Sequence, residues 1–285
     1  MTITRVGVVG AGLMGSGIAE VLARAGLDVV VRDINDEAVA AGRGRITASL
    51  DKGVSRGKLT AEARDAALAS LTFTTEIARM ADRQLVIEAA SENEDIKKAI
   101  FAELDSYVTD PDAILASNTS SMPIIRFAQA TSRPDRVLGL HFFNPAPVQP
   151  LVEIISSVVT DPAVADTMEQ FTTEVLGKSP IRADDRPGFV VNALLVPYLF
   201  SAIRMLENGY ASKEDIDAGM RNGCAHPMGP IRLSDVVGLD TLYFIGVSMF
   251  EETGDPAHKP PLLLSRMVDA GMMGKKSGRG FYDDY

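Results

Sequence analysis

The sequence predicts an α/β protein in which a doubly wound parallel sheet occupies residues 1–184 and an all-helical domain occupies residues 185–285. Two observations predict this architecture. Up to about Ala183, short apolar or β-branched runs alternate with helix-like segments, as in repeated strand-helix-strand units. After Arg186-Pro187-Gly188, strand-like runs nearly vanish and long helical periodicities take over. A chain of 285 residues is also long enough for two domains with separate cores.

The predicted strands are continuous in hydrophobicity rather than alternating between apolar and polar residues. This pattern is typical of strands that are covered by helices on both faces of a sheet. The predicted strands are Arg5–Val9, Asp28–Asp33, Gln84–Glu88, Ala113–Ala116, Val137–Phe142, Leu151–Ile155 and Ser179–Arg182.

The C-terminal part begins with two predicted helices, Phe189–Asn208 and Ser212–Asn222. Ser212 is a plausible N-cap of the second helix, with Asp215 in its first turn. The first helix is apolar nearly all round, which predicts burial between domains or between subunits.

The composition limits the kinds of partner that the protein is expected to bind and the compartment in which it is expected to reside. The net charge of −10 argues against a nucleic-acid partner, because neutralising a phosphate backbone needs clustered Lys and Arg. The single cysteine, Cys224, cannot form an internal disulfide and has no metal-ligand spacing around it, so we expect no metal site and a reducing, cytoplasmic location. The first strand begins too early for a signal peptide, and the longest apolar stretch contains Asn192 and Pro197, so we expect no membrane span.

A glycine-rich turn follows the first predicted strand and opens a helix, as in Rossmann-type dinucleotide-binding domains. Gly10 permits the tight turn, Gly12 lets the backbone approach a pyrophosphate, and Gly15 lets helix and strand pack closely. The turn reads Gly10-Ala11-Gly12-Leu13-Met14-Gly15.

The second predicted strand ends in Asp33, about 20 residues beyond the glycines, where a carboxylate accepts hydrogen bonds from a ribose hydroxyl. A carboxylate there repels a 2′-phosphate, which favours NAD over NADP. Arg32 leaves NADP open, because its guanidinium could accommodate a 2′-phosphate. The alternative to a dinucleotide site is a strand-helix-strand unit that binds no ligand.

His141 ends the fifth predicted strand, at the sheet edge where doubly wound folds bind ligands. An imidazole there could remove a hydroxyl proton while hydride passes to a nicotinamide. Glu153 interrupts the apolar run Leu151–Ile155, and a buried carboxylate needs a partner such as His141. The alternatives are a hydrogen-bonded core histidine and an edge-strand glutamate that faces water.

Two further features place polar groups near the expected site. The run Ser117-Asn118-Thr119-Ser120-Ser121 follows an apolar strand, although ordinary turn and capping chemistry explains it equally well. Asn192 lies one turn into the apolar helix near the domain junction. It could bind a substrate oxygen in a cleft between the domains or simply bond a neighbouring helix.

Together these motifs resemble the L-3-hydroxyacyl-CoA dehydrogenase family, and within it the short bacterial 3-hydroxybutyryl-CoA dehydrogenases, particularly actinobacterial ones. The resemblance runs essentially from end to end. The segments that carry it are Gly10–Gly15, Ser117–Ser121, His141-Phe142-Phe143-Asn144-Pro145, Leu151-Val152-Glu153, Pro187–Asn192, His226-Pro227-Met228-Gly229-Pro230, Val237-Gly238-Leu239-Asp240 and Gly274–Tyr282.

The resemblance implies roles for individual residues. His141 would be the general base, Glu153 its orienting partner, and Ser120 and Asn192 hydrogen-bond partners of the reacting oxygen. Residues implied near NAD are Asp33, Glu92, Lys97, Asn144 and Lys276.

The resemblance further implies that basic residues after the second strand bind coenzyme A. Lys52 and Arg56 stand at the matching positions, four apart and therefore on one helix face, although Gly53 and Gly57 weaken that helix. A solvated charged face is the alternative. The family likeness also implies a homodimer formed through the C-terminal domain.

The sequence therefore predicts an NAD-dependent enzyme that interconverts an L-3-hydroxyacyl-CoA, expected to be 3-hydroxybutyryl-CoA, and the 3-ketoacyl-CoA. A dehydrogenase of free hydroxy acids or sugar acids is one alternative, because relatives with this architecture accept carboxylates without CoA. A catalytically silent NAD-binding protein is the other, although such a protein has no need of Ser120, His141, Glu153 and Asn192 together.

Overall fold

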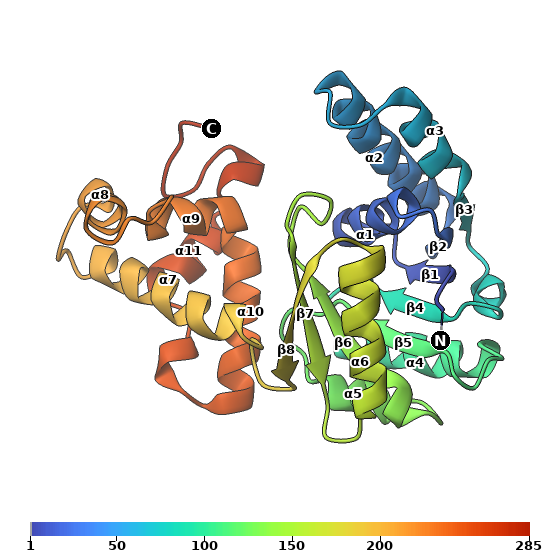
Figure 1. Cartoon of the computed structure of the whole chain (residues 1–285). Helices are drawn as coiled ribbons and strands as arrows, with labels where there is room; N and C mark the ends of the chain where they lie inside the picture. Colours follow the sequence, from blue (N-terminus) through green and yellow to red (C-terminus); the bar gives the residue numbers. More distant parts are fainter. Residues whose placement is uncertain (1) are drawn as a thin grey trace. The chain divides into compact units, whose positions relative to one another are not determined.

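The structure, a computed structural model, describes residues 2–285 and divides into two compact units (Figure 1). The first unit extends to Arg186, and the second comprises Pro187–Tyr285. The first contains the sheet and the second is helical, which confirms the predicted fold class.

The sheet of the first unit has eight strands in the order β3-β2-β1-β4-β5-β6-β7-β8. Strands β1 to β6 are parallel in the order of a dinucleotide-binding sheet, whereas β7 is antiparallel to β6 and parallel to β8. Their bounds are β1 Arg5–Val9, β2 Asp28–Arg32, β3 Leu71–Thr74, β4 Leu85–Glu88, β5 Ile114–Ser117, β6 Val137–Phe142, β7 Leu151–Ser156 and β8 Ser179–Asp184.

Two features of this sheet were not predicted. The edge strand β3 was missed, because its four residues are only partly buried and two of them are threonine. The reversed direction of β7 was also missed, since a hydrophobic run carries no information about strand polarity.

Helices cover both faces of the sheet. Side chains of α1, α2 and α6 share one apolar core with alternate strand residues such as Val8, Ile87 and Leu140. The opposite face is covered from α4 and α5, where Phe101 stacks on Phe127 with ring centroids 5.4 Å apart. The helices are α1 Leu13–Arg24, α2 Asp36–Ser55, α3 Ala61–Ala69, α4 Glu94–Tyr107, α5 Ile124–Ala128 and α6 Pro162–Gln170.

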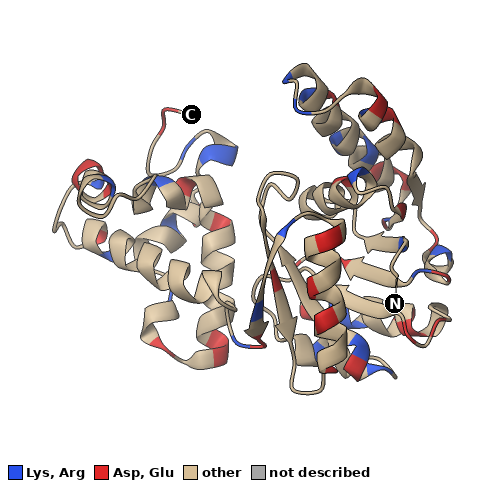
Figure 2. Ribbon diagram, in the orientation of Figure 1, with Lys and Arg blue, Asp and Glu red and all other residues tan. Residues whose placement is uncertain are grey.

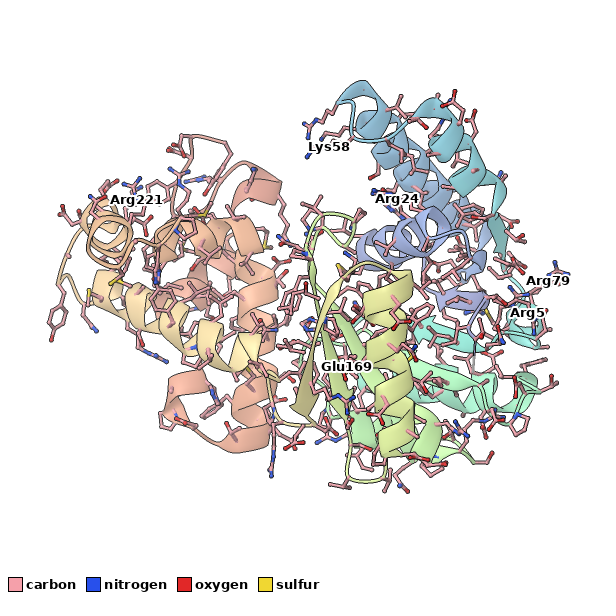
Figure 3. The ribbon with its side chains drawn as sticks, viewed as in Figure 1. Arg5, Arg24, Lys58, Arg79, Glu169 and Arg221 are labelled. Atoms are coloured by element: carbon pink, nitrogen blue, oxygen red, sulfur yellow. The ribbon has the colours of Figure 1, made fainter. Side chains whose placement is uncertain are left out.

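Helices α2 and α3 form a hairpin that projects from the sheet (Figure 1). Asn35 caps the start of α2 by accepting a hydrogen bond from Ala38 N, and Thr60 caps α3 in the same way through Ala63 N. Acidic and basic side chains are interspersed on this hairpin (Figure 2). Figure 3 shows Lys58 at its tip.

The second unit has its own apolar core, built around Leu199, Phe200 and Leu242. As predicted, Ser212 caps α8 by accepting a hydrogen bond from Asp215 N. The helices of this unit are α7 Val191–Glu207, α8 Lys213–Cys224, α9 Pro230–Val237, α10 Leu239–Thr253 and α11 Leu262–Asp269.

Helix α7 begins two residues later than predicted. Gly188 and Phe189 both have positive φ values, 77° and 53°, and a residue with positive φ cannot belong to a right-handed helix. The chain therefore turns at these two residues before α7 begins.

Within residues 2–285, no single helix is long and apolar enough to cross a membrane. Helices α9 and α10 reach the required length and hydropathy only as a pair, and they are bent by 93° relative to each other.

Candidate active site

Four buried polar side chains line one face of the sheet near the ends of β4 to β7. They are Glu88, Ser117, His141 and Glu153, each at most 3% exposed. Because successive strand residues face opposite sides, their apolar neighbours Ile87, Ala116, Leu140 and Ile154 belong to the core on the other face. The register pairs Glu88 with Ser117 and His141 with Glu153, so the four residues form a polar row across adjacent strands.

His141 is hydrogen-bonded through both ring nitrogens. Its Nδ1 lies 2.7 Å from Glu153 Oε2, and its Nε2 lies 3.0 Å from Ser120 Oγ. A carboxylate only accepts hydrogen bonds, so we assign the proton of the neutral ring to Nδ1. This tautomer leaves Nε2 as an acceptor toward the hydroxyl of Ser120, which suits a general base.

A buried ion pair lies at the other end of the polar row. Lys97 on α4 has no exposed surface, and its Nζ donates to Glu88 Oε1 and Oε2 at 2.8 and 3.0 Å. Glu88 also accepts hydrogen bonds from Ser117 Oγ and Ala90 N. All three partners are donors, as a buried carboxylate requires.

Glu92 joins the ion pair to the loop that carries Ser120. Its Oε2 lies 3.1 Å from Lys97 Nζ, and its Oε1 accepts a hydrogen bond of 3.0 Å from Ser120 N. Thr119 Oγ1 donates to the same oxygen. The loop is thereby held from the side opposite His141, and Glu92 is the one exposed carboxylate of the group, with 40% of its side chain accessible.

The glycine-rich turn has the steric features of a dinucleotide cradle. A Cβ on Gly15 would lie 1.8 Å from Gly10 O, and one on Gly10, where φ is 101°, would lie 2.5 Å from Ala89 O. A Cβ on Gly12 would meet nothing within 4 Å. Leu13 is 65% exposed and Met14 is half-buried. The turn is therefore closed toward the protein and open on the side where a pyrophosphate would approach.

Asp33 follows β2 directly and is half-buried beside this turn. Its Oδ2 accepts a hydrogen bond of 2.6 Å from Ala11 N, and its Oδ1 accepts one from Ile34 N. The carboxylate is thus fixed between the turn and the end of β2, where a ribose would lie in such a fold.

Asn144 lies in the loop between β6 and β7 and is exposed. Lys178 holds this loop by donating to the carbonyls of Ala146 and Gln149 at 2.8 and 2.6 Å. Burial lowers the pKa of the Lys178 amine, and the nearby Arg24 lowers it further. The loop also packs on α1, where a Cβ on Gly17 would lie 3.2 Å from Ala146 Cβ.

Two predicted site residues belong to the second unit. Asn192 is buried in the first turn of α7, and Lys276 lies in the turn Gly274–Gly278, where its amine pairs with Asp240. The first unit therefore holds His141, Glu153 and Ser120, which are bonded to one another, together with the glycine turn, whereas Asn192 and Lys276 belong to the second unit.

The two residues predicted to bind CoA lie at the end of α2. Lys52 is in the last turn and Arg56 is the C-cap residue, and both are exposed. A shallow cavity of about 510 Å³ lies along α2 between Asp36 and Asp51 and ends one residue before Lys52.

Two residues of this region were missed from the sequence. Glu88 ends the apolar run Leu85–Ile87, so the reasoning applied to Glu153 would have identified it. Lys178 follows a glycine in an ordinary turn, and no signal in the sequence marks its contact with the carbonyls of a distant loop. No cluster of three or more possible metal ligands occurs in the described chain.

Comparison with known proteins identifies the family. The model for the NAD-binding domain of 3-hydroxyacyl-CoA dehydrogenase matches residues 5–186, and the model for the C-terminal domain of the same enzyme matches residues 188–284. The chain belongs to the 3-hydroxyacyl-CoA dehydrogenase family. The predictions of this family, of a dehydrogenase and of NAD as its cofactor are confirmed.

Individual relatives cover the whole chain. A 3-hydroxybutyryl-CoA dehydrogenase from Mycobacterium tuberculosis is 62% identical over 280 residues, which are 98% of each chain. The human mitochondrial hydroxyacyl-coenzyme A dehydrogenase is 42% identical over 98% of this chain and 91% of its own length. The crystal structure of FadB2 from M. tuberculosis has a TM-score of 0.97 at 61% identity and covers 99% of both chains. The likeness to an actinobacterial 3-hydroxybutyryl-CoA dehydrogenase is therefore confirmed as well.

The open side of the glycine turn leads to a first prediction. Gly12 has φ of −65°, which any residue adopts, so Gly12→Ala should leave the melting temperature of the apoenzyme unchanged. The new methyl group would occupy the approach of the pyrophosphate and should raise the Kd of NADH by about tenfold or more. Gly15→Ala should lower the melting temperature, because its Cβ meets a backbone oxygen. Calorimetry and fluorescence titration would measure both effects, and unchanged NADH binding by the Gly12 variant would contradict the assigned position.

The buried ion pair leads to a second prediction. Glu88→Gln should lower the free energy of unfolding by about 3 kcal/mol, because Lys97 then keeps only Glu92 as a charged partner. The double change Glu88→Gln with Lys97→Met should cost less than the sum of the single changes. Glu94→Gln, which weakens two partly exposed ion pairs, with Lys98 and Arg126, should cost less than about 1 kcal/mol. Urea unfolding would measure these values, and equal losses for Glu88→Gln and Glu94→Gln would refute the importance of burial.

Proposed function

We propose that this chain interconverts L-3-hydroxybutyryl-CoA and acetoacetyl-CoA with NAD, using His141 as general base and Glu153 as its orienting partner. The observation that carries the proposal is the chain of hydrogen bonds from Glu153 through His141 to Ser120. It lies at the strand ends of an NAD-binding domain, where ligands of such sheets bind. The relatives named for 3-hydroxybutyryl-CoA support the short acyl chain.

Bound NAD supplies the hydride acceptor. The protein supplies the base: Nε2 of His141, which bonds to Ser120 Oγ in the structure, takes the proton of the 3-hydroxyl group. Glu153 lies on Nδ1, so its carboxylate stabilises the imidazolium that results. In the reverse direction His141 returns the proton to the oxygen of the ketone.

Ser120 and Asn192 orient the reacting oxygen. Ser120 is already within hydrogen-bond distance of Nε2, so an oxygen that bonds to both groups is fixed in position. Asn192 would add a donor from the second unit. The remaining residues proposed near the cofactor are Asp33 at the ribose, and Glu92, Asn144 and Lys276. Lys97 has no exposed surface, so it would act there through its ion pair with Glu92.

The test is NADH consumption with acetoacetyl-CoA, run beside free acetoacetate and with NADPH in place of NADH. We expect rapid turnover only with NADH and the thioester, because Asp33 disfavours a 2′-phosphate. Turnover of free acetoacetate would indicate that the substrates are free hydroxy acids rather than CoA thioesters. Tight NADH binding without turnover would identify a silent binding protein and refute the proposal.

The catalytic pair is tested by two conservative changes. His141→Gln and Glu153→Gln should each lower kcat by roughly 10²- to 10⁴-fold, because the base is lost or loses its orientation. The Kd of NADH should stay within about twofold, since neither residue belongs to the cofactor turn. Near-normal turnover of either variant would show that another group accepts the proton.

We further propose that Lys52 and Arg56 bind the phosphates of CoA. Both are exposed cations at one end of α2, suited to a mobile polyanion. The double variant Lys52→Met with Arg56→Met should raise the KM of acetoacetyl-CoA about tenfold and leave the KM of NADH unchanged. Arg79→Met removes an exposed cation that lies outside α2, in the turn Ile77–Met80, and serves as control (Figure 3). If both variants raised the KM of acetoacetyl-CoA equally, the effect would come from the overall charge of the protein and not from a local phosphate site.

A homodimer formed through the second unit is also proposed. Leu194 on α7 and Phe244 on α10 are 73% and 62% exposed, and such a contact would bury these apolar side chains. Analytical ultracentrifugation would test the stoichiometry, with a monomer at micromolar concentration as the contrary result.

A further inference from the structure

The peptide group of Ala11, inside the glycine turn, is held from both ends by side chains. Its N–H donates to Asp33 Oδ2 at 2.6 Å. Its carbonyl oxygen accepts one hydrogen bond from Ser16 Oγ at 2.8 Å and a second from Arg45 Nη2 at 2.5 Å. Arg45 Nε also lies 3.4 Å from Ser16 Oγ, so the guanidinium and the hydroxyl act on the same oxygen.

Arg45 reaches the turn because α2 packs closely on it. A Cβ on Gly42 would lie 2.5 Å from Ala11 Cβ, so only glycine allows this approach. Residues three apart lie on one face of a helix, and Arg45 therefore extends from the contact that Gly42 makes. By contrast Arg43, on the same helix, stacks on the ring of Phe73 at 4.7 Å.

The two bonds to the Ala11 carbonyl fix the direction of the next N–H group. In a trans peptide the C=O of one residue and the N–H of the next point in opposite directions. Since the Ala11 oxygen is directed at Ser16 and Arg45, the N–H of Gly12 faces away from them. Gly12 is exposed, and a Cβ on it would meet no atom within 4 Å, so the backbone at this residue borders the open side of the turn.

We propose that Arg45 is a positioning residue of the cofactor site. Its guanidinium, together with Ser16 Oγ, locks the Ala11 carbonyl so that the Gly12 N–H is presented to the pyrophosphate of NAD. Its positive charge lies behind the same peptide and complements the charge of the two phosphates. The glycine fingerprint alone accounts for the shape of the turn, whereas this contact determines the orientation of one of its donors.

The test separates cofactor affinity from turnover. Arg45→Met should raise the Kd of NADH about tenfold, which corresponds to about 1.4 kcal/mol, and leave kcat at saturating NADH unchanged. The Kd of ADP-ribose, which keeps the pyrophosphate and lacks the nicotinamide, should rise by the same factor. Arg45→Lys should recover part of the loss, because an ammonium can still donate to the Ala11 oxygen. Arg43→Met is the matched control and should leave both Kd values unchanged.

A second variant keeps the proposal open to test if Arg45→Met is poorly folded. Ser16→Ala removes the other donor to the same oxygen and should also weaken NADH and ADP-ribose. The combined variant should show non-additive effects on Kd, because both groups hold one carbonyl. Unchanged binding of NADH by Arg45→Met, an equal loss in Arg43→Met, a loss confined to NADH, or strict additivity with Ser16→Ala would each overturn the proposal.

Discussion

The active-site end of the sheet is organised by the need to pair charged groups that are removed from water. Glu88, Lys97, His141 and Glu153 are each at most 3% exposed, and a polar or charged group without a partner at such a depth costs about one to several kcal/mol. In the structure His141 is paired with Glu153 on the neighbouring strand, and Glu88 is paired with Lys97 on α4. The carboxylates of Glu88 and Glu153 face hydrogen-bond donors, and these donors are directed at carboxylate oxygens. The hydrogen bonds therefore favour one orientation of each side chain. A base held in this way needs little reorganisation when the substrate arrives.

The reversal of strand direction at β7 makes the pairing of His141 with Glu153 possible. The loop after β6 brings the chain back beside the same strand, and the antiparallel register then places the two residues opposite each other. Residues opposite each other on paired strands project to the same face, within reach of a direct hydrogen bond. Lys178 stabilises the returning loop through two of its carbonyls, at the cost of burying an amine whose pKa falls as a result. Lys178 thus holds the loop that contains Asn144 and connects the strands of His141 and Glu153.

Much of this arrangement could be predicted from residue patterns, for physical reasons that differ between elements. Strands buried on both faces stand out as apolar runs, so seven of the eight were identified, and the exposed edge strand β3 was not. Glu153 was identified because a carboxylate inside such a run needs a partner. The sequence could not reveal that Lys97 turns inward to Glu88, because that contact depends on how α4 packs on the sheet. Nor could it reveal Arg45, which is one cation among several on a helix with little apolar periodicity.

The chain divides at Arg186, and the residues proposed for proton transfer all belong to the first unit. His141, proposed as the base, is bonded to Glu153 and to Ser120 inside the first unit. Asn192 and Lys276 belong to the second unit. The segment between the units begins at a fixed point, because Asp185 accepts hydrogen bonds from Ile124 N and Ile125 N at the start of α5. That helix follows the loop of Ser120, so one carboxylate ties the origin of the linker to the catalytic loop.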